Sequence, residues 1–356
     1  MICSIKKLEE EVIMKKIIVF VVAVCVAMTS FAGCAAFAAD LDFTFGVAMR
    51  RYDDTFLTDE RNAISATAKE LGMPVDIVDS QASQTTQNDR IDIFLAKRYG
   101  AIGINLQELS AAAPLIEKCR AIGAGAIFFN NNPEDDVFFT YDKAYYIGAR
   151  AEQSGIYQGE MMAKYFKDNP DKVPADGIIR YVMLTGDPGS QDMLLRTKHS
   201  VDTLSESFKV DCIGQEIGGW DRVRGQEKMA AFLAAHGDEI NCVFANNDDM
   251  ALGAIEALKA SGYFQGKPGD PGYKFMPVVG VDATVPGVAA LKEGTMLGTV
   301  LNDPIGQGGT TARVAYLIMK GEPVNEQTVG YPIDREKFIW IPYVKVTLDN
   351  VDQIRP

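Results

Sequence analysis

Short apolar runs alternate with amphipathic stretches along the chain from Asp42 onward. The runs are rich in β-branched and aromatic residues, and the stretches between them repeat apolar residues at helical spacing. This alternation is typical of βαβ units that build a parallel sheet. The first half is expected to contain strands at 43–48, 75–78, 101–105 and 126–129 and helices at 58–71, 84–97 and 111–122.

A second set of alternating segments follows a helix expected at 153–168. Its strands are expected at 178–184, 210–215, 242–245 and 276–279, and its helices at 192–207, 222–235 and 250–261. Two sets of this kind predict an α/β protein made of two doubly wound, parallel-sheet lobes. The length of 356 residues agrees with two domains, since one domain usually takes roughly 100–200 residues.

The first 39 residues have the pattern of a secretory signal peptide. Lys15 and Lys16 precede an unbroken apolar stretch at 17–28, which is shorter than the roughly 20 residues that a membrane span needs. We expect translation to start at Met14, because the segment before it carries three glutamates that spoil the cationic region.

Two modes of cleavage are compatible with this signal. The tetrad Phe31-Ala32-Gly33-Cys34 resembles a bacterial lipobox, in which Cys34 becomes the lipidated first residue of an exported lipoprotein. Ordinary cleavage after Ala-Phe-Ala at 36–38 would instead release a soluble periplasmic protein. Removal of residues 1–39 takes away four lysines and three glutamates, so the net charge changes from −13 to −14.

The acidic composition argues against several kinds of partner. The chain has 35 Lys plus Arg against 48 Asp plus Glu and no basic run, so nucleic acid and anionic membrane surfaces are disfavoured. After export only Cys119, Cys212 and Cys242 would remain beside Cys34, and no CxxC motif occurs. A zinc site of the usual Cys/His kind is therefore excluded.

Asp, Asn and aromatic residues follow the ends of the expected strands. Ligands of open parallel sheets bind beyond the carboxyl ends of the strands. The segments at these ends are 52–56, Asn105, 130–132, 186–192, 219–221, 246–248, Asp282 and 302–303. Carboxylate and amide groups can bond to adjacent hydroxyls, and an aromatic face packs on the C–H face of a pyranose ring. Since no phosphate-binding glycine motif occurs, the pattern favours a neutral polyol.

Several strings of residues resemble those of the type I periplasmic sugar-binding proteins, and most closely their galactose/glucose-binding members. The strings lie between about Phe45 and Val346 and are Tyr52-Asp53-Asp54, Gln87-Asn88-Asp89-Arg90-Ile91-Asp92, Tyr141-Asp142-Lys143-Ala144-Tyr145-Tyr146-Ile147-Gly148, Ala245-Asn246-Asn247-Asp248, Gly280-Val281-Asp282-Ala283 and Gly298-Thr299-Val300-Leu301-Asn302-Asp303. The resemblance implies a three-segment hinge that crosses near residues 149, 302 and 338. One lobe would contain 40–149 plus 303–338, and the other 150–302 plus 339–356.

The resemblance also implies which residues bind a monosaccharide. Phe56 and Trp220 would stack on opposite faces of the ring. Ser190 stands where the galactose/glucose binders carry a histidine, so the preferred hexose stays open. The expected hydroxyl ligands are Asp54, Asn130, Ser190, Asp192, Arg196, Asn247, Asp282 and Asn302. Arg196 follows Asp192 by four residues, so a surface salt bridge on a helix is an alternative role for that pair.

The calcium loop that the resemblance implies is degenerate in this sequence. Segment 172–180 keeps a carboxylate only at Asp176 and carries Lys172 and Arg180, and Asn241 occupies the position of the remote glutamate. Calcium takes about 6–8 oxygen ligands. We therefore expect neither a metal nor another cofactor.

The expected function is that of a non-enzymatic, monomeric receptor of an ABC sugar importer. The lobes would close on galactose or glucose, and the closed form would be recognised by a membrane permease. One alternative is a binding protein for another pentose or hexose that also serves a chemoreceptor or sensor. A more distant one is a glycoside hydrolase using carboxylates such as Asp54 and Asp192. A repressor of this fold would carry a helix-turn-helix where this chain has a signal peptide.

Overall fold

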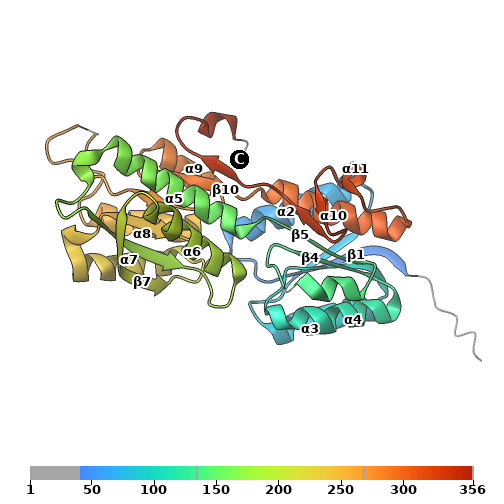
Figure 1. The fold of residues 1–356 in the computed structure, drawn as a ribbon. Helices are drawn as coiled ribbons and strands as arrows, with labels where there is room; N and C mark the ends of the chain where they lie inside the picture. Colours follow the sequence, from blue (N-terminus) through green and yellow to red (C-terminus); the bar gives the residue numbers. More distant parts are fainter. Residues whose placement is uncertain (1–40, 134, 268, 355–356) are drawn as a thin grey trace, which may run out of the picture. The chain divides into compact units, whose positions relative to one another are not determined.

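The computed structural model describes residues 41–133, 135–267 and 269–354. The expected signal peptide, with Met14 and Cys34, lies outside these residues. Within them the chain builds two lobes, each with a sheet covered by helices on both faces (Figure 1). The fold class predicted from the sequence is confirmed. No helix of the described ranges is long and apolar enough to cross a membrane.

The sheet of the first lobe has seven strands in the order β11-β12-β5-β4-β3-β1-β2. All neighbours pair in parallel except β11 and β12. The strands are β1 (Asp42–Met49), β2 (Val75–Asp79), β3 (Tyr99–Ile104), β4 (Gly125–Phe129), β5 (Ala144–Gly148), β11 (Ile333–Asp334) and β12 (Phe338–Trp340). The helices are α2 (Thr55–Glu70), α3 (Gln84–Ala96), α4 (Ala112–Ile122), α10 (Pro304–Lys320) and α11 (Glu326–Val329).

Successive residues of β1 belong to two different hydrophobic cores. Val47 packs in a core with residues of α2 and α10, whereas Ala48 packs in a core with residues of α3 and α4. Side chains of a strand alternate between the two faces of its sheet, so each face carries one helix layer. Burial on both faces explains why the strand reads as a continuous apolar run rather than an alternating one.

The sheet of the second lobe has the order β7-β6-β8-β9, and single bridges connect its edge to a pair formed by β10 and β13. One core lies against α5 and α6 and another against α7, α8 and α9. The strands are β6 (Ile178–Thr185), β7 (Lys209–Ile217), β8 (Cys242–Ala245), β9 (Val278–Val279), β10 (Thr299–Leu301) and β13 (Val344–Val346). The helices are α5 (Ala151–Asp168), α6 (Gln191–Ser205), α7 (Arg222–His236), α8 (Asp248–Ala260) and α9 (Val285–Lys292).

The chain passes between the lobes three times, after β5, after β10 and after β12. The first two crossings come after Gly148 and after Leu301. The third does not lie at 338, because Phe338–Trp340 continues the first sheet as β12, in parallel register with Tyr146–Gly148. The amide of Ile341 still donates to the carbonyl oxygen of Gly148 at 2.8 Å. Residues 339 and 340 therefore belong to the first lobe.

Candidate ligand-binding site

One pocket is lined by all ten side chains that the sequence predicts as ligands. These are Asp54, Phe56, Asn130, Ser190, Asp192, Arg196, Trp220, Asn247, Asp282 and Asn302. Arg50, Leu57 and Asn131 also line it. The space free of atoms is about 380 Å³ when the open solvent at its mouth is included. The lining comes from both lobes, at the carboxyl ends of their strands.

Asp54 and Phe56 come from the start of α2. The carboxylate Oδ1 of Asp54 accepts a hydrogen bond from the amide of Leu57 at 2.9 Å and so caps the helix. Burial raises the pKa of Asp54 despite this bond. Phe56 follows in the first turn with its ring buried. The helix cap thus fixes the place of both an acidic group and an aromatic face.

Asn130 follows β4 in the left-handed backbone region, with φ of 61°. Its carbonyl oxygen accepts from the Tyr146 hydroxyl at 2.7 Å, and its Oδ1 accepts from Asn105 Nδ2 at 3.2 Å. Asparagine is among the few residues that adopt this conformation readily. With its oxygens engaged, Asn130 has its Nδ2 group left to donate to a ligand.

The second lobe directs helix N-termini at the pocket. Ser190 is the N-cap residue of α6, but its side chain makes no capping bond, which leaves the hydroxyl for a ligand. Asn247 caps α8, since its Oδ1 accepts from the amide of Met250 at 3.0 Å. Its Nδ2 also donates to the carbonyl oxygen of Trp220 at 3.3 Å. The cap of one helix therefore also fixes the loop that carries the indole.

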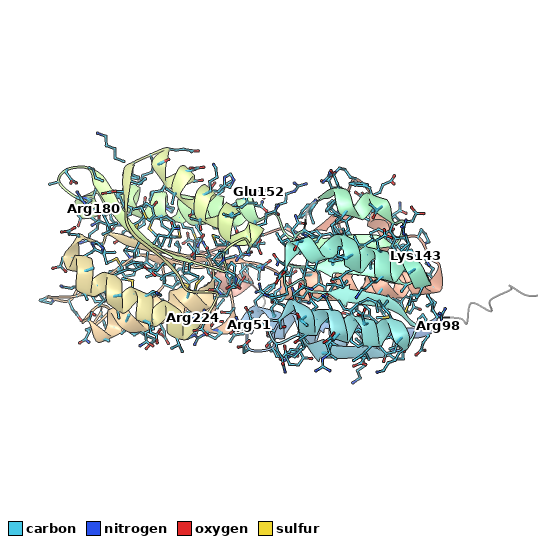
Figure 2. The ribbon with its side chains drawn as sticks, turned by 90° about the horizontal axis from the view of Figure 1, so that it is seen from below. Arg51, Arg98, Lys143, Glu152, Arg180 and Arg224 are labelled. Carbon is cyan, nitrogen blue, oxygen red and sulfur yellow. The ribbon has the colours of Figure 1, made fainter. Side chains whose placement is uncertain are left out.

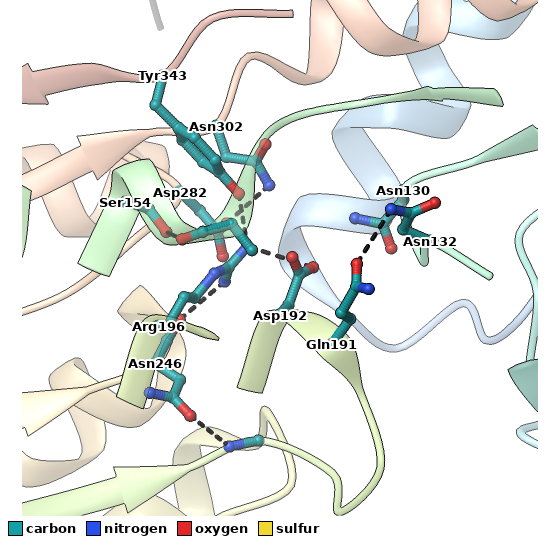
Figure 3. A network of polar contacts seen from close by, with 12 residues as sticks. Asn130, Asn132, Ser154, Gln191, Asp192, Arg196, Asn246, Asp282, Asn302 and Tyr343 are labelled. Carbon is teal, nitrogen blue, oxygen red and sulfur yellow. Dashed lines mark hydrogen bonds and ion pairs between the residues drawn. The ribbon is translucent and has the colours of Figure 1, made fainter. Parts of the chain in front are cut away.

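Arg196 is the centre of the polar network in the second lobe (Figure 3). Its Nη1 donates to the carbonyl oxygen of Asn246 at 2.8 Å, its Nη2 donates to the Tyr343 hydroxyl at 2.9 Å, and Nη2 lies 3.4 Å from Asp192 Oδ2. Burial alone would lower the pKa of Arg196, but Tyr343, Asp192 and Asp282 outweigh it and raise the pKa. Only 3% of its side chain is exposed, so the alternative of a surface salt bridge is wrong.

Trp220 packs its indole ring directly over Gly186. A Cβ atom on Gly186 would lie 2.0 Å from Cζ2 of the ring, so no larger residue fits there. The ring also lies 5.6 Å from the guanidinium carbon of Arg196. The indole Nε1 is buried without an acceptor among the described residues. A buried donor without a partner is costly, which fits a group that meets a ligand.

Asp282 and Asn302 close the network at the second crossing. Asn302 Nδ2 donates to Asp282 Oδ1 at 3.3 Å, and Gln307 Nε2 donates to Asn302 Oδ1 at 2.5 Å. Burial raises the pKa of Asp282 well above its usual value, and burial also raises the pKa of Asp192. The pocket thus combines carboxyl, amide, hydroxyl and guanidinium groups with two aromatic rings, a set that suits hydroxyl-rich ligands.

Asp176 of segment 172–180 and the more distant Asn241 both bond to Arg180. The carboxylate of Asp176 forms an ion pair with Arg180, whose Nη2 lies 2.5 Å away. The Oδ1 of Asn241 accepts from the backbone amide of the same arginine at 2.7 Å. Protein donors therefore occupy the side-chain oxygens that calcium would need. Across the described ranges, no group of three or more His, Cys, Asp or Glu could hold a metal ion.

Comparison with known proteins gives consistent relatives. A family model described as a periplasmic binding protein domain matches residues 45–323. A D-galactose/methyl-galactoside binding periplasmic protein of Haemophilus influenzae is 35% identical over 95% of this chain and 98% of its own. A ribose import binding protein of Bacillus subtilis is 26% identical over 83% and 87%. The crystal structure of a Bacillus halodurans solute-binding protein with bound myo-inositol matches with a TM-score of 0.73 at 28% identity, over 88% and 98%.

Proposed function

Since the chain belongs to the periplasmic binding protein family, we propose that it binds galactose or glucose as the solute receptor of an ABC sugar importer. Members of this family are binding proteins and not enzymes, which removes the glycoside hydrolase from consideration. The class of ligand follows from relatives that bind sugars or related polyols. Within that class of sugars and polyols, we propose galactose or glucose as the ligand.

The observation that carries the proposal is the convergence of ten predicted ligands on one pocket. Phe56 comes from the first lobe and Trp220 from the second, so a pyranose ring between them could be covered on both faces. The carboxyl and amide groups around them can bond to equatorial and axial hydroxyls alike. An analogue that lacks one hydroxyl would leave a protein group unpaired, at about 1–3 kcal/mol.

The identity of the hexose depends on Ser190. The relative named for D-galactose supports galactose, whereas relatives named for ribose and myo-inositol show that the fold accepts other ligands. The serine hydroxyl is shorter than an imidazole, so a water molecule would bridge it to the sugar. Ser190 is therefore the residue at which this receptor would depart from the galactose/glucose binders.

We propose that ligand binding selects the form in which the lobes contact each other. Asn132 of the first lobe donates from Nδ2 to Gln191 Oε1 of the second at 3.0 Å (Figure 3). The three crossing segments would act as the hinge, and the permease would recognise the combined surface of both lobes. The same surface could serve a chemoreceptor, and we propose that the receptor is a monomer.

Isothermal titration of the mature protein tests the ligand. The panel contains galactose, glucose, ribose, arabinose, allose and myo-inositol, and Asp282→Ala serves as the variant with a damaged pocket. We expect galactose or glucose to bind more tightly than every other compound, and the variant to bind none measurably. Tighter binding of ribose or myo-inositol would contradict the hexose assignment. The absence of any binding would contradict the receptor role in sugar uptake.

We propose export by the N-terminal signal, with lipidation at Cys34. Intact-mass analysis of protein from a membrane fraction should then show a chain that begins at Cys34 with added acyl mass. An unmodified chain that begins at Ala39 or Asp40 would contradict lipidation and indicate a soluble periplasmic receptor.

We also propose that the protein needs no calcium. The fit of segment 172–180 to calcium is poor because Arg180 already occupies Asp176. The melting temperature should be the same with a chelator as with added calcium. A fall in the melting temperature on adding the chelator would contradict this proposal.

A further inference from the structure

Arg50 lines the pocket, although the sequence comparison assigned it no role. It follows directly after β1, and its backbone is held on both sides. Its amide donates to Asn105 Oδ1 at 3.1 Å, and its carbonyl oxygen accepts from the amide of Ala82 at 2.8 Å. These two hydrogen bonds fix the backbone of Arg50 at the carboxyl end of β1, from which its side chain reaches the pocket.

The guanidinium of Arg50 is buried but incompletely paired. The residue is only 7% exposed, and its Nε is buried without an acceptor among the described residues. Its Nη1 lies 3.6 Å from Asp187 Oδ2 in the second lobe, which is beyond hydrogen-bond distance. A buried cation with an unused donor is costly, so the ion pair with Asp187 does not by itself explain this arrangement.

The neighbouring Arg51, in the same loop, has its guanidinium group paired with a carboxylate. Its Nε and Nη2 donate to the two carboxylate oxygens of Asp53 at 2.6 and 2.8 Å. That pair is bidentate, and Arg51 does not line the pocket. Arg51 is labelled in Figure 2.

Acidic pocket residues lie within electrostatic reach of Arg50. Burial raises the pKa of Asp54 and of Asp192, and the charge of Arg50 opposes that rise in both. Guanidinium groups only donate and carboxylates only accept. A hydroxyl placed between Arg50 and one of these acids would accept from the arginine and donate to the carboxylate, and both hydrogen bonds would then be satisfied.

We propose that Arg50 is a further sugar ligand, which donates to one hydroxyl and thereby selects sugars that carry it. This inference rests on the proposed function of the same pocket. The donors of Arg50 are directional and the charge is poorly hydrated when buried, so the contact favours one hydroxyl position over others. Arg50 would then share with Ser190 the control of which hexose is bound.

The test compares Arg50→Met with the control variant Arg51→Met. Both are titrated with the sugar that the wild-type protein prefers and with its monodeoxy derivatives, one for each hydroxyl. Arg50→Met should bind the parent sugar about 10- to 100-fold more weakly, as for the loss of a charged hydrogen bond. One monodeoxy sugar should bind the wild type and Arg50→Met equally, because its missing hydroxyl removes the same contact. Arg51→Met should match the wild type throughout.

Two results would overturn the inference. One is an unchanged affinity of Arg50→Met for the parent sugar. The other is the same loss for the parent and every monodeoxy sugar, which would mean a structural effect without a hydroxyl contact. Arg50→Lys keeps the charge but loses the planar fork, and it is used in the same panel if Arg50→Met does not melt cooperatively. If the wild type binds no sugar, the proposed function itself fails, which is a distinct outcome.

Discussion

Trp220 shows how much a single pocket side chain depends on its neighbours. Its backbone lies in the left-handed region, with φ of 66°, where bulky residues are uncommon. Asn247 holds its carbonyl oxygen from one side, and Gly186 leaves room for the ring on the other. The ring orientation is therefore set by Asn247, which also lines the pocket, and by Gly186, which does not.

The substitution Gly186→Ala tests this dependence. The new methyl group would overlap the ring, so the indole must shift and lose part of its packing on the sugar. We expect about a 2- to 10-fold loss of affinity, the usual range for one aromatic contact. Fluorescence of Trp220 in a Trp340→Phe background reports both the shift and the titration. Unchanged affinity and emission would mean that Gly186 has no such role.

Asp248 lies behind the pocket and links three chain segments. Its Oδ2 accepts from the amide of Thr284 at 2.8 Å, and its Oδ1 accepts from Thr299 Oγ1 at 2.6 Å. Burial raises the pKa of Asp248 to about 7, although these hydrogen bonds lower it. Between its unfolded pKa and 7, the folded state holds a proton that the unfolded state has released. The free energy of unfolding therefore falls as the pH rises through this window.

The substitution Asp248→Asn should remove this contribution. The fall in unfolding free energy between pH 5 and 7 should become shallower by up to about 1.4 kcal/mol per pH unit, the value for one full proton. Urea unfolding of the sugar-free protein at several pH values measures it. An unchanged slope in Asp248→Asn would contradict the assignment.

At this scale, the ten residues that the family resemblance implies as ligands line one pocket, and their contact with a sugar stays a prediction. The sequence did not mark Arg50 and Leu57, which also line the pocket, and it included Asn131 only as part of the strand-end segment 130–132. Arg50 lies between the end of the expected strand and the matching string that starts at Tyr52, so neither pattern included it. Its burial and its unpaired Nε are properties of the folded protein, and no local pattern of residues reports them.

Among the elements, the sequence predicted helices α2 to α8 but not α9, α10 or α11. Local signals mark the helices, as where Ser83 caps α3 through the amide of Thr86. In contrast, β5 was not predicted as a strand. It is short, and one of its two partners, β12, follows almost two hundred residues later in the chain. A strand whose partner is so distant in the sequence cannot be recognised from the residues next to it.

The contact between α2 and α10 permits a prediction with an internal control. A Cβ on Gly308 would lie 2.5 Å from the backbone oxygen of Glu60, whereas one on Gly309 would meet only Thr67 Oγ1 at 3.3 Å. Gly308→Ala should lower the free energy of unfolding by about 1–3 kcal/mol through overpacking. Gly309→Ala should raise it by up to about 1 kcal/mol through helix propensity. Denaturant unfolding separates them, and equal effects would contradict this close helix contact.

At the scale of the whole molecule, direct side-chain contacts such as Asn132–Gln191 and Arg50–Asp187 join the lobes beside the crossing segments. The bond from Asn132 to Gln191 is one of them, and neither residue lines the pocket. If this bond forms only when the lobes meet, part of the measured sugar affinity comes from it. Affinity would then depend on residues that never touch the ligand.

A double-mutant cycle with Asn132→Ala and Gln191→Ala tests this. Each single substitution should weaken sugar binding by about 2- to 10-fold, in line with one hydrogen bond. The double variant should be no weaker than either single one, because the same bond is lost. Calorimetric titration measures all four proteins. Additive losses would show that the two side chains act separately.

The lobes themselves were predictable because each half repeats the same alternation of strand and helix. The third crossing was placed near 338 from the family resemblance alone, whereas residues 339 and 340 belong to β12. Their place is set by pairing of β12 with β5. Whether β12 can pair with β5 depends on the path that the chain takes through the first two crossings. That path is a property of the complete fold.

Two residues of the pocket also cap helices, and this limits which positions can change when the preference for a sugar changes. Asp54 and Asn247 each hold a helix start as well as facing the ligand, so replacing either one damages folding and recognition together. Ser190 makes no capping bond with its side chain, and Arg50 lies outside any helix. Neither side chain therefore holds a helix start. A library aimed at new sugar preferences should therefore randomise Arg50 and Ser190 first and leave the capping residues unchanged.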